Sequence, residues 1–457
     1  FAAQYCSRQA ALLYLTQRQQ EYSEAAAVLN KARQLDASNI ALQVAAIRLD
    51  LRQESFAPAM DKTEQLLAQA PTNLPALASF FALKNQAGEP DIALQRIQQT
   101  AASNPDNQNI ALLLARVALA LNKPTITLEA MSAIDSDRSA PATYWPMQGM
   151  SLLRTNQIDA AEKHYQTWSE LYPNQENAVM GQLLILDGKR NYAEGARVAS
   201  TFLKRKDNIQ VKLMQSYFYV MSGNTAAAKT SLAEVPERFT PLPFARGVKA
   251  RIALAEDRPV DAIEDALVAY DANKNTNNLF IYYRALQLSG QDDKSFAVLQ
   301  DHVNAFANDL RAKMVLAERL ITTNEDGAIK TYVDILKVSP TNFVALNNVA
   351  YLYMENGKLE EAMEYASKAY EIQPDNVATA DTYAQILLRQ GKIEEAVKAY
   401  NRVMDDKVTN EEIFLNYIEA LLKNGNKVIA ERRISDLALS QAESIARLAA
   451  LRQDYQL

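Results

Sequence analysis

Few residues in this chain of 457 have the types and spacing that catalysis or metal binding requires. There is one cysteine, Cys6, and there are two histidines, His164 and His302, far apart in the sequence. Neither histidine has a histidine, cysteine or acidic partner at the spacing of metal ligands. The sequence also lacks a glycine-rich phosphate loop and an elbow-type serine. We therefore predict a protein that is not an enzyme and holds no metal and no cofactor.

Arginines form a first group of candidate binding residues, because they recur at two places of a repeated pattern. If they share one inward face, that face is more positive than the net charge of −6 suggests, and it suits acidic peptides or anionic polysaccharide. The alternative is a set of arginines spread over solvated helix faces, with their aliphatic stems packed down. The arginines concerned are Arg18, Arg48, Arg52, Arg116, Arg154, Arg251 and Arg284.

Large, flexible apolar residues form a second group of candidate binding residues. Such side chains suit an apolar helix or peptide that must be accommodated in a groove. The alternative is that they pack between neighbouring helices, and an error of one residue in the register would bury several of them. The group consists of Met150, Met180, Leu184, Met214, Phe218, Met221, Phe244 and Phe280.

Both groups are placed by a 34-residue period that runs through the chain. A fixed period of this length over more than four hundred residues is typical of stacked helix-turn-helix units. It predicts units that end near 37, 71, 105, 139, 173, 207 and 241, then 274, 307 and 340 after three one-residue contractions, then 374, 408 and 442. The residues that mark the period are Pro71, Pro105, Pro173, Pro241, Pro340 and Pro374, with Ala25, Ala59, Ala93, Ala362, Ala396 and Ala430.

Each unit also carries residues that start, reverse and stop helices. Glycines such as Gly357 and Gly391 stand where the first helix must end and reverse, a position that favours positive φ. A proline at the unit end stops the second helix because it lacks an amide hydrogen. Polar residues around these points, as in Ser38-Asn39 and Pro374-Asp375-Asn376, can cap the helix that follows. The sequence therefore predicts an all-α solenoid of about thirteen units, followed by a C-terminal capping helix.

The best unit runs from Ala345 to Pro374 and resembles the tetratricopeptide repeat. Leu346 takes the large place of its first helix, Ala350 the small place and Tyr353 the aromatic place. The resemblance implies a right-handed superhelix whose first helices line a concave surface. It also implies that other proteins or peptides bind there. Some such modules clamp a terminal carboxylate, but the places concerned carry Asn347, Tyr351, Asp381 and Gln385, and the acid would repel a carboxylate.

Two irregular stretches interrupt the period. Ser132 to Pro146 contains two prolines and two aspartates, so we expect a longer or distorted link there. Pro236 to Pro243 contains three prolines and acts either as a hinge or as a stiff loop between ordinary repeats. We therefore divide the chain into an N-terminal array (1–235), a possible hinge loop (236–243), a C-terminal array (244–442) and a capping helix (443–457).

Composition and charge limit the class of partner and the compartment. A content of 48% hydrophobic and 22% charged residues is that of a folded chain, and the small net charge implies no nucleic acid partner. No apolar run is long enough to span a bilayer. Cys6 lacks the small apolar residues that precede a lipidated cysteine, so we expect a buried helix residue. The chain begins at Phe1 without an initiator methionine, so a targeting segment could lie upstream.

The C-terminal third resembles one bacterial group, the tetratricopeptide lipoproteins associated with exosortase (PEP-CTERM) sorting and exopolysaccharide systems. The resemblance rests on the runs Pro340 to Tyr353 and Glu364 to Asn376, and on Lys427 to Leu451. It implies a protein-binding scaffold in envelope assembly, exopolysaccharide export or protein sorting. It also implies a periplasmic location or an upstream lipidated anchor. The alternatives are a cytosolic peptide-binding adaptor or co-chaperone-like regulator, and the repeat arm of a larger enzyme.

Overall fold

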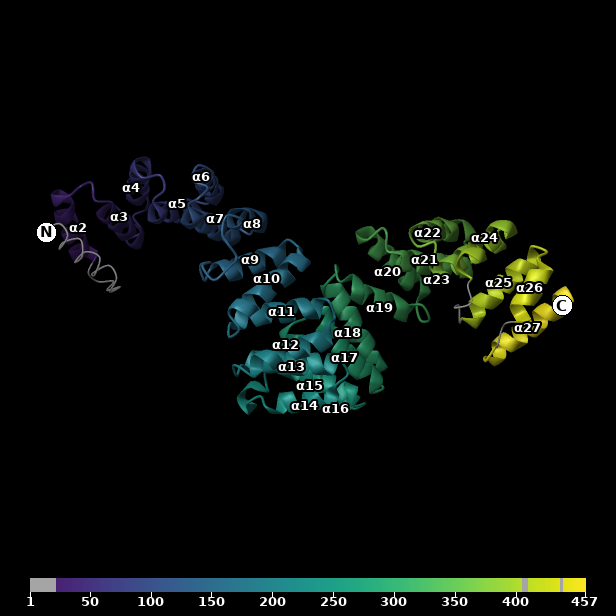
Figure 1. Ribbon diagram of the computed structural model, residues 1–457. Coiled ribbons are helices and arrows are strands. Elements are labelled where there is room, and N and C mark those ends of the chain that lie inside the picture. Colours follow the sequence, from purple (N-terminus) through teal and green to yellow (C-terminus); the bar gives the residue numbers. More distant parts are fainter. Residues whose placement is uncertain (1–21, 405–409, 436–438) are drawn as a thin grey trace. The chain divides into compact units, whose positions relative to one another are not determined.

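The computed structural model describes residues 22–404, 410–435 and 439–457, and within these ranges it contains helices and no strand. The contacts divide the chain into two compact units, Phe1–Val235 and Pro236–Leu457. The division falls where the predicted hinge segment begins. Each unit is a series of helix pairs in chain order (Figure 1). We call the two helices of a pair its first and second helix.

The first unit begins with a lone second helix, followed by six pairs. Its second helices are α2 (Tyr22–Leu35), α4 (Phe56–Gln69), α6 (Pro90–Ala102), α8 (Pro124–Met131), α10 (Ile158–Leu171), α12 (Tyr192–Leu203) and α14 (Thr225–Ala233). Its first helices are α3 (Ile40–Arg52), α5 (Leu74–Gln86), α7 (Gln108–Ala120), α9 (Tyr144–Arg154), α11 (Glu176–Gly188) and α13 (Ile209–Met221). The first helix of the first predicted unit, which ends near 37, would precede Tyr22 and falls outside the described residues.

The second unit opens with a short 3-10 helix, η2 (Glu237–Phe239), followed by six pairs and a final helix, α27 (Ala442–Tyr455). Its first helices are α15 (Pro243–Ala255), α17 (Thr276–Leu288), α19 (Leu310–Leu320), α21 (Phe343–Glu355), α23 (Val377–Arg389) and α25 (Glu411–Lys423). Its second helices are α16 (Pro259–Ala272), α18 (Asp292–Ala305), α20 (Glu325–Val338), α22 (Leu359–Ile372), α24 (Ile393–Val403) and α26 (Lys427–Ser435).

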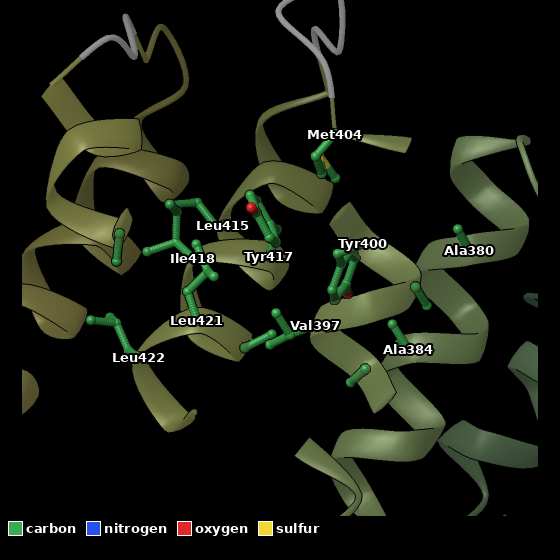
Figure 2. Packing of buried hydrophobic residues seen from close by; sticks show 14 of the residues in the cluster. Ala380, Ala384, Val397, Tyr400, Met404, Leu415, Tyr417, Ile418, Leu421 and Leu422 are labelled. Carbon is green, nitrogen blue, oxygen red and sulfur yellow. The ribbon is translucent and has the colours of Figure 1, made fainter. Parts of the chain in front are cut away.

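Each helix packs against its near neighbours in the chain. Extensive contacts join the two helices of a pair and each second helix to the next first helix within each unit, and weaker ones join a first helix to the first helix of the next pair, as in α21 with α23 and α23 with α25. Helix pairs stacked in this way form a continuous core along one dimension. The predicted all-α solenoid is confirmed. In the second unit, Val397 and Tyr400 of α24 lie between α23 and α25, as Figure 2 shows.

Asparagine caps begin most of the first helices. The side chain of Asn376 accepts a hydrogen bond from the backbone N–H of Thr379 at 3.1 Å, and Asn39 accepts from Leu42 at 3.3 Å, which confirms both predicted caps. Each such bond satisfies a helix N–H that has no partner inside the helix, and removing one costs about 1 kcal/mol. The remaining asparagine caps are Asn73, Asn107, Asn208, Asn275, Asn342 and Asn410, and the aspartate Asp309 makes the same bond at α19.

A residue with positive φ joins the two helices of every described pair except α19 and α20. The prediction for the reversal glycines is confirmed, since Gly357 has a φ of 71° and Gly391 a φ of 78°. The residues that do this in order are Glu54, Gly88, Asn122, Asn156, Arg190, Gly223, Asp257, Gly290, Gly357, Gly391 and Gly425. Because each marks the same point of its pair, their spacing measures the register directly.

This spacing corrects one part of the predicted register. The reversal residues are 34 apart from Glu54 to Arg190, but Gly223 follows Arg190 after only 33. The first of the three contractions therefore lies before position 241 and not after it. The other two fall between Asp257 and Gly357, inside the predicted range. Side chains of α13 consequently stand one residue away from their predicted places.

Most of each irregular stretch lies outside the α-helices. The link between α8 and α9 covers 132–143, where most links hold only a few residues, and so the predicted long link at Ser132 to Pro146 is confirmed. Ile134 and Ala140 of this link are buried, and Tyr172 donates a hydrogen bond to the carbonyl of Arg138 at 3.2 Å. The stretch from Pro236 to Leu242 contains η2 and precedes α15, and its role as a hinge stays a prediction.

Candidate functional site

One place recurs in each first helix between buried residues, and in all of these helices except α13 its side chain is exposed or half-buried. We call it the central place, and we call the surface that these residues form within each unit the first-helix face of that unit. Along the first unit the central places hold Arg48, Ala82, Arg116, Met150, Leu184 and Tyr217. Along the second unit they hold Arg251, Arg284, Glu318, Tyr351, Gln385 and Glu419. The chemical character of the face therefore changes along the chain, although its geometry repeats.

Met150 and Leu184 form an apolar part of this face in the first unit. They occupy the central places of α9 and α11, two first helices that contact each other. Met150 is 42% exposed and Leu184 is 58% exposed. Met180 lies one turn before Leu184 on α11 and is half-buried. Three of the predicted groove residues are therefore brought together at a surface.

The contraction before Gly223 removes Phe218 from this surface. Phe218 is fully buried, and its ring fills the space beside Gly195 of α12, where a Cβ atom would overlap it. The central place of α13 is taken by Tyr217, which is itself buried and donates a hydrogen bond to Asp187 at 2.6 Å. The prediction that Phe218 contacts a ligand is therefore wrong, because the residue is part of the core. Met214 is half-buried on the same helix.

The remaining apolar candidates do not join Met150 and Leu184. Met221 is half-buried at the end of α13 in the first unit. Phe244 and Phe280 belong to the second unit: Phe244 is 44% exposed in the first turn of α15, and Phe280 is half-buried on α17. The guanidinium of Arg311 lies 4.9 Å from the centre of the Phe280 ring and covers part of it. These residues therefore do not extend the apolar surface of α9 and α11.

The candidate arginines are mostly exposed. In the first unit, Arg48, Arg52, Arg116 and Arg154 are exposed, and Arg154 donates a hydrogen bond to Asn122 at 3.3 Å. In the second unit, Arg284 is exposed, whereas Arg251 is half-buried and donates to the carbonyl of Gly247 at 3.1 Å. Arg116 and Arg154 lie on α7 and α9, beside the apolar surface. Arg18, like Cys6, lies outside the described residues.

Both histidines serve the core. His164 is within 2.9 Å of the carbonyl of Trp145, and burial lowers its pKa. His302 lies between the hydroxyl of Tyr270 at 2.9 Å and the carboxylate of Asp309 at 3.0 Å, so both of its ring nitrogens are occupied. Asp309 in turn caps α19. Within the described ranges no group of three histidine, cysteine or acidic residues is placed to hold a metal ion.

A buried carboxylate in the second unit has more partners than the sequence suggests. Asp381 of α23 accepts hydrogen bonds from Tyr400 at 2.6 Å, Asn416 at 3.0 Å and Gln385 at 2.8 Å. Burial raises the pKa of Asp381, while these three donors act in the opposite direction. The residue ties α23 to α24 and α25. Asp381 therefore has a structural role, because it links neighbouring helices. In the sequence, the only sign of this role is that the next two helices carry possible donors, Tyr400 and Asn416.

The second helices of the first unit border a separate open cavity, of about 570 Å³, between α10 and α12 over α11. Its floor includes Val179, Leu186 and Phe202, and its rim carries both acidic and basic side chains, among them Glu170 and Arg205. The candidate binding residues predicted from the sequence lie on first helices, whereas most residues that line this cavity belong to the second helices α10 and α12. Because the rim carries side chains of both charges, the cavity does not favour either an anionic or a cationic ligand.

Comparisons with known proteins identify the repeat. Family models described as tetratricopeptide repeat match residues 86–135, 326–377 and 353–413, so both units contain such repeats. No curated protein matches the chain. Among 308 matching chains of known structure is one from a crystal structure of the APC/C hetero-tetramer Cut9-Hcn1. It is 11% identical with a TM-score of 0.42, and the match covers 96% of this chain and 98% of that one. No described helix is long and apolar enough to cross a membrane.

Proposed function

We propose that this protein is a non-catalytic scaffold that binds other proteins through its first-helix face. The observation that carries the proposal is the exposure of Met150 and Leu184 at the same place of two contacting first helices. Single exposed apolar side chains are common on protein surfaces. Two of them occupy equivalent places of adjacent helices, and Met180 lies one turn from Leu184; we call these three residues the apolar strip, which a partner can cover.

The strip has the features of a site for an apolar peptide or helix. Methionine and leucine adapt their shape to different partners, and apolar anchors that lose their contact with water supply most of the affinity of such sites. The strip lies beside the cations Arg116 and Arg154. A segment that carries apolar anchors and nearby acidic residues would therefore fit best.

We further propose that the partners belong to bacterial envelope assembly, exopolysaccharide export or protein sorting. The support is the similarity of the C-terminal third to the exosortase-associated lipoproteins. On this proposal the protein works in the periplasm or is held there by an upstream lipidated segment. An anionic polysaccharide would be a second ligand, bound by exposed arginines such as Arg48 and Arg116. A cytosolic peptide-binding adaptor would use the same strip, so the compartment is a separate question that fractionation of cells answers.

Site-specific crosslinking tests the strip directly. A photo-crosslinking amino acid at Leu184 should yield a defined adduct with a partner protein in the native organism. The same amino acid at Ile92, an exposed residue of the second helix α6 in the same unit, should not. The adduct from Leu184 should disappear in the Met150→Glu variant and remain in the Ile92→Glu variant.

The two apolar positions are a matched pair, because Leu184 is 58% exposed and Ile92 is 48% exposed. Both changes to glutamate should leave the circular dichroism unchanged. Equal adduct yields from Leu184 and Ile92, or an adduct that survives Met150→Glu, would contradict binding at this strip. Loss of polysaccharide binding on Arg48→Ala and Arg116→Ala, with the protein adduct retained, would separate the second ligand from the first.

A further inference from the structure

Met150 is the only exposed methionine of this chain. The sequence contains eleven methionines, and all of them lie within the residues that the structure describes. Met150 is 42% exposed, whereas the other ten are buried or half-buried. The buried ones are Met131, Met147, Met354 and Met404, and the half-buried ones are Met60, Met180, Met214, Met221, Met314 and Met363.

Two methionines of the same helix, α9, lie in opposite environments. Met147 is 8% exposed and belongs to the buried cluster that includes Trp145 and Trp168. Met150 follows three residues later, at the central place of α9. The oxidation of a methionine depends on the access of solvent to its sulfur. A dissolved oxidant therefore reaches Met150 before it reaches Met147.

The thioether of an exposed methionine reacts with a peroxide in a two-electron step. The sulfur lone pair attacks one peroxide oxygen, so that an S–O bond forms while the O–O bond breaks. With hydrogen peroxide, the proton on the transferred oxygen passes to the departing oxygen, which leaves as water. The sulfur is thereby oxidised to a sulfoxide and the peroxide is reduced, and no other reactant is required.

The position of Met150 gives this oxidation a consequence for binding. Met150 belongs to the apolar strip, and the equivalent place of the contacting helix α11 holds Leu184, which has no sulfur to oxidise. A sulfoxide is polar, and its oxygen accepts hydrogen bonds. An apolar partner that covers this oxygen leaves the acceptor without a hydrogen bond, which weakens binding.

We propose that Met150 is a redox-sensitive modification site, at which a peroxide forms the sulfoxide and thereby releases the partner of the apolar strip. This regulation rests on the binding function proposed above, because it concerns the same strip. The partner binds when Met150 carries the thioether and leaves when it carries the sulfoxide. Enzymatic reduction of the sulfoxide reverses the change.

Peptide mapping after peroxide treatment tests the first half of the proposal without a partner. The single cysteine is alkylated, and the chain is then treated with hydrogen peroxide and cut with trypsin. Met147 and Met150 lie in one tryptic peptide, residues 139–154, so fragment ions compare their two sulfurs directly. Met150 should be oxidised faster than each of the other ten methionines, and about tenfold faster than Met147. Equal rates at Met147 and Met150 would overturn the proposal.

Crosslinking from Leu184 tests the second half. The chain that carries the photo-crosslinking amino acid at Leu184 is treated with hydrogen peroxide, freed of the oxidant with catalase and mixed with a lysate of the native organism. The yield of the partner adduct should fall at least about fivefold relative to the untreated chain. Methionine sulfoxide reductases for both sulfoxide epimers should restore it. Circular dichroism before and after the treatment checks that the helices are intact.

Two variants show which sulfur is responsible, and each is compared with its own untreated sample. Met150→Leu has no sulfur at this place, so peroxide should change its adduct yield less than about twofold. Met180→Leu keeps Met150 and should lose the adduct as the parent chain does. Sensitivity that remains in Met150→Leu, or that disappears in Met180→Leu, would overturn the proposal.

The same experiment separates failure of the regulation from failure of the binding function. If the untreated chain forms no adduct from Leu184, the proposed function is refuted and the regulation with it. If an adduct forms and survives complete oxidation of Met150, the regulation alone is refuted.

Discussion

The ring of Tyr165 lies directly over the backbone of Gly181, so that a Cβ atom at Gly181 would overlap the ring. Gly149 lies near the hydroxyl end of the same ring, and a Cβ atom at Gly149 would come within 2.5 Å of Tyr165 Cζ. Two glycines on successive first helices, α9 and α11, thus admit one tyrosine of the second helix between them. The close packing of this pair depends on the absence of two side chains.

We expect Gly181→Ala to lower the free energy of unfolding of the first unit by about 1–3 kcal/mol, because the new methyl group displaces the Tyr165 ring. Gly188→Ala, in the last position of the same helix, meets no atom within 4 Å and should be neutral or stabilising by up to about 1 kcal/mol. Urea unfolding followed by tryptophan fluorescence measures both. The two tryptophans, Trp145 and Trp168, belong to the first unit, so their signal reports that unit alone.

Phe218 and Leu184 should respond in opposite ways to truncation. Phe218→Ala empties a fully buried site and should cost about 3–5 kcal/mol in the same fluorescence assay. Leu184→Ala removes an exposed side chain and should change stability by less than about 0.5 kcal/mol. A small effect at Phe218 together with a large one at Leu184 would show that the register of α13 is not the one described.

Asp381 should make the second unit less stable as the pH rises. Burial raises the folded-state pKa above that of the unfolded chain, so the folded state holds the proton more strongly. Stability is then lost as the pH rises above about 4 and through the folded-state pKa. Asp381→Asn lacks this proton, so its stability relative to the parent chain should improve from pH 4 to pH 7. Thermal melts by circular dichroism measure the difference, and a constant difference across this range would refute the prediction.

Glu411 should make the last helix sensitive to acid in the opposite sense. Its carboxylate accepts hydrogen bonds from the Ser440 hydroxyl at 2.6 Å, from the backbone N–H of Ser440 at 2.7 Å and from the backbone N–H of Gln441 at 3.2 Å. Together these bonds lower the pKa of Glu411 to about 2. The ionised carboxylate of Glu411 stabilises the folded state above the ordinary glutamate pKa, and this stabilisation is lost as the pH falls toward 2. Hydrogen exchange of α27 amides should therefore speed up between pH 5 and pH 3, after correction for the intrinsic rate.

The Glu411→Gln variant provides the reference for this measurement. Its side chain cannot titrate, so the protection of α27 should be lower than in the parent chain at pH 5 and should change little by pH 3. If the parent chain keeps the same protection at both values, Glu411 does not anchor α27.

The fold could be predicted from the sequence because the period fixes both helix boundaries and turns. Reversal glycines such as Gly357 and unit-ending prolines such as Pro374 each force one backbone event, and they recur at a constant distance. Caps at Ser38-Asn39 and at Asp375-Asn376 could be predicted for the same reason, and the asparagine makes the bond in both. Local chemistry of this kind acts within one unit and does not require knowledge of the packing.

The register of α13 could not be predicted from Pro173 and Pro241, the two prolines that mark the period on either side of this helix. Pro173 and Pro241 are 68 residues apart, which equals two full periods. The contraction before Gly223 is hidden in this interval, because the two prolines do not mark the same point of their units: Pro173 lies 17 residues before the reversal residue Arg190, and Pro241 lies 16 before Asp257. The asparagine caps contain the missing signal, since Asn107 and Asn208 are one residue short of three periods apart. That signal would have placed Phe218 in the core.

The candidate site was predicted only in part, because exposure depends on packing between units of the repeat. Met150 and Leu184 lie where the register puts them, and both reach the surface. Tyr217 takes the same place in α13 but is buried, since its hydroxyl bonds to Asp187 of the preceding first helix. Residues at the same place of the period therefore differ in exposure, and the packing of the neighbouring helices determines which of them reach the surface.

The near-neighbour packing of these helices bears on how the chain can change in length. In the second unit, Asn342 and Asn376 cap first helices at equivalent points, and the 34 residues between them contain one complete pair. Excising that segment would join equivalent backbone positions and require one new interface of a kind already present, since extensive contacts reach no farther than two helices along the chain. Duplication of the same segment would insert a unit in the same way. A gene of this design can gain or lose binding surface in whole steps.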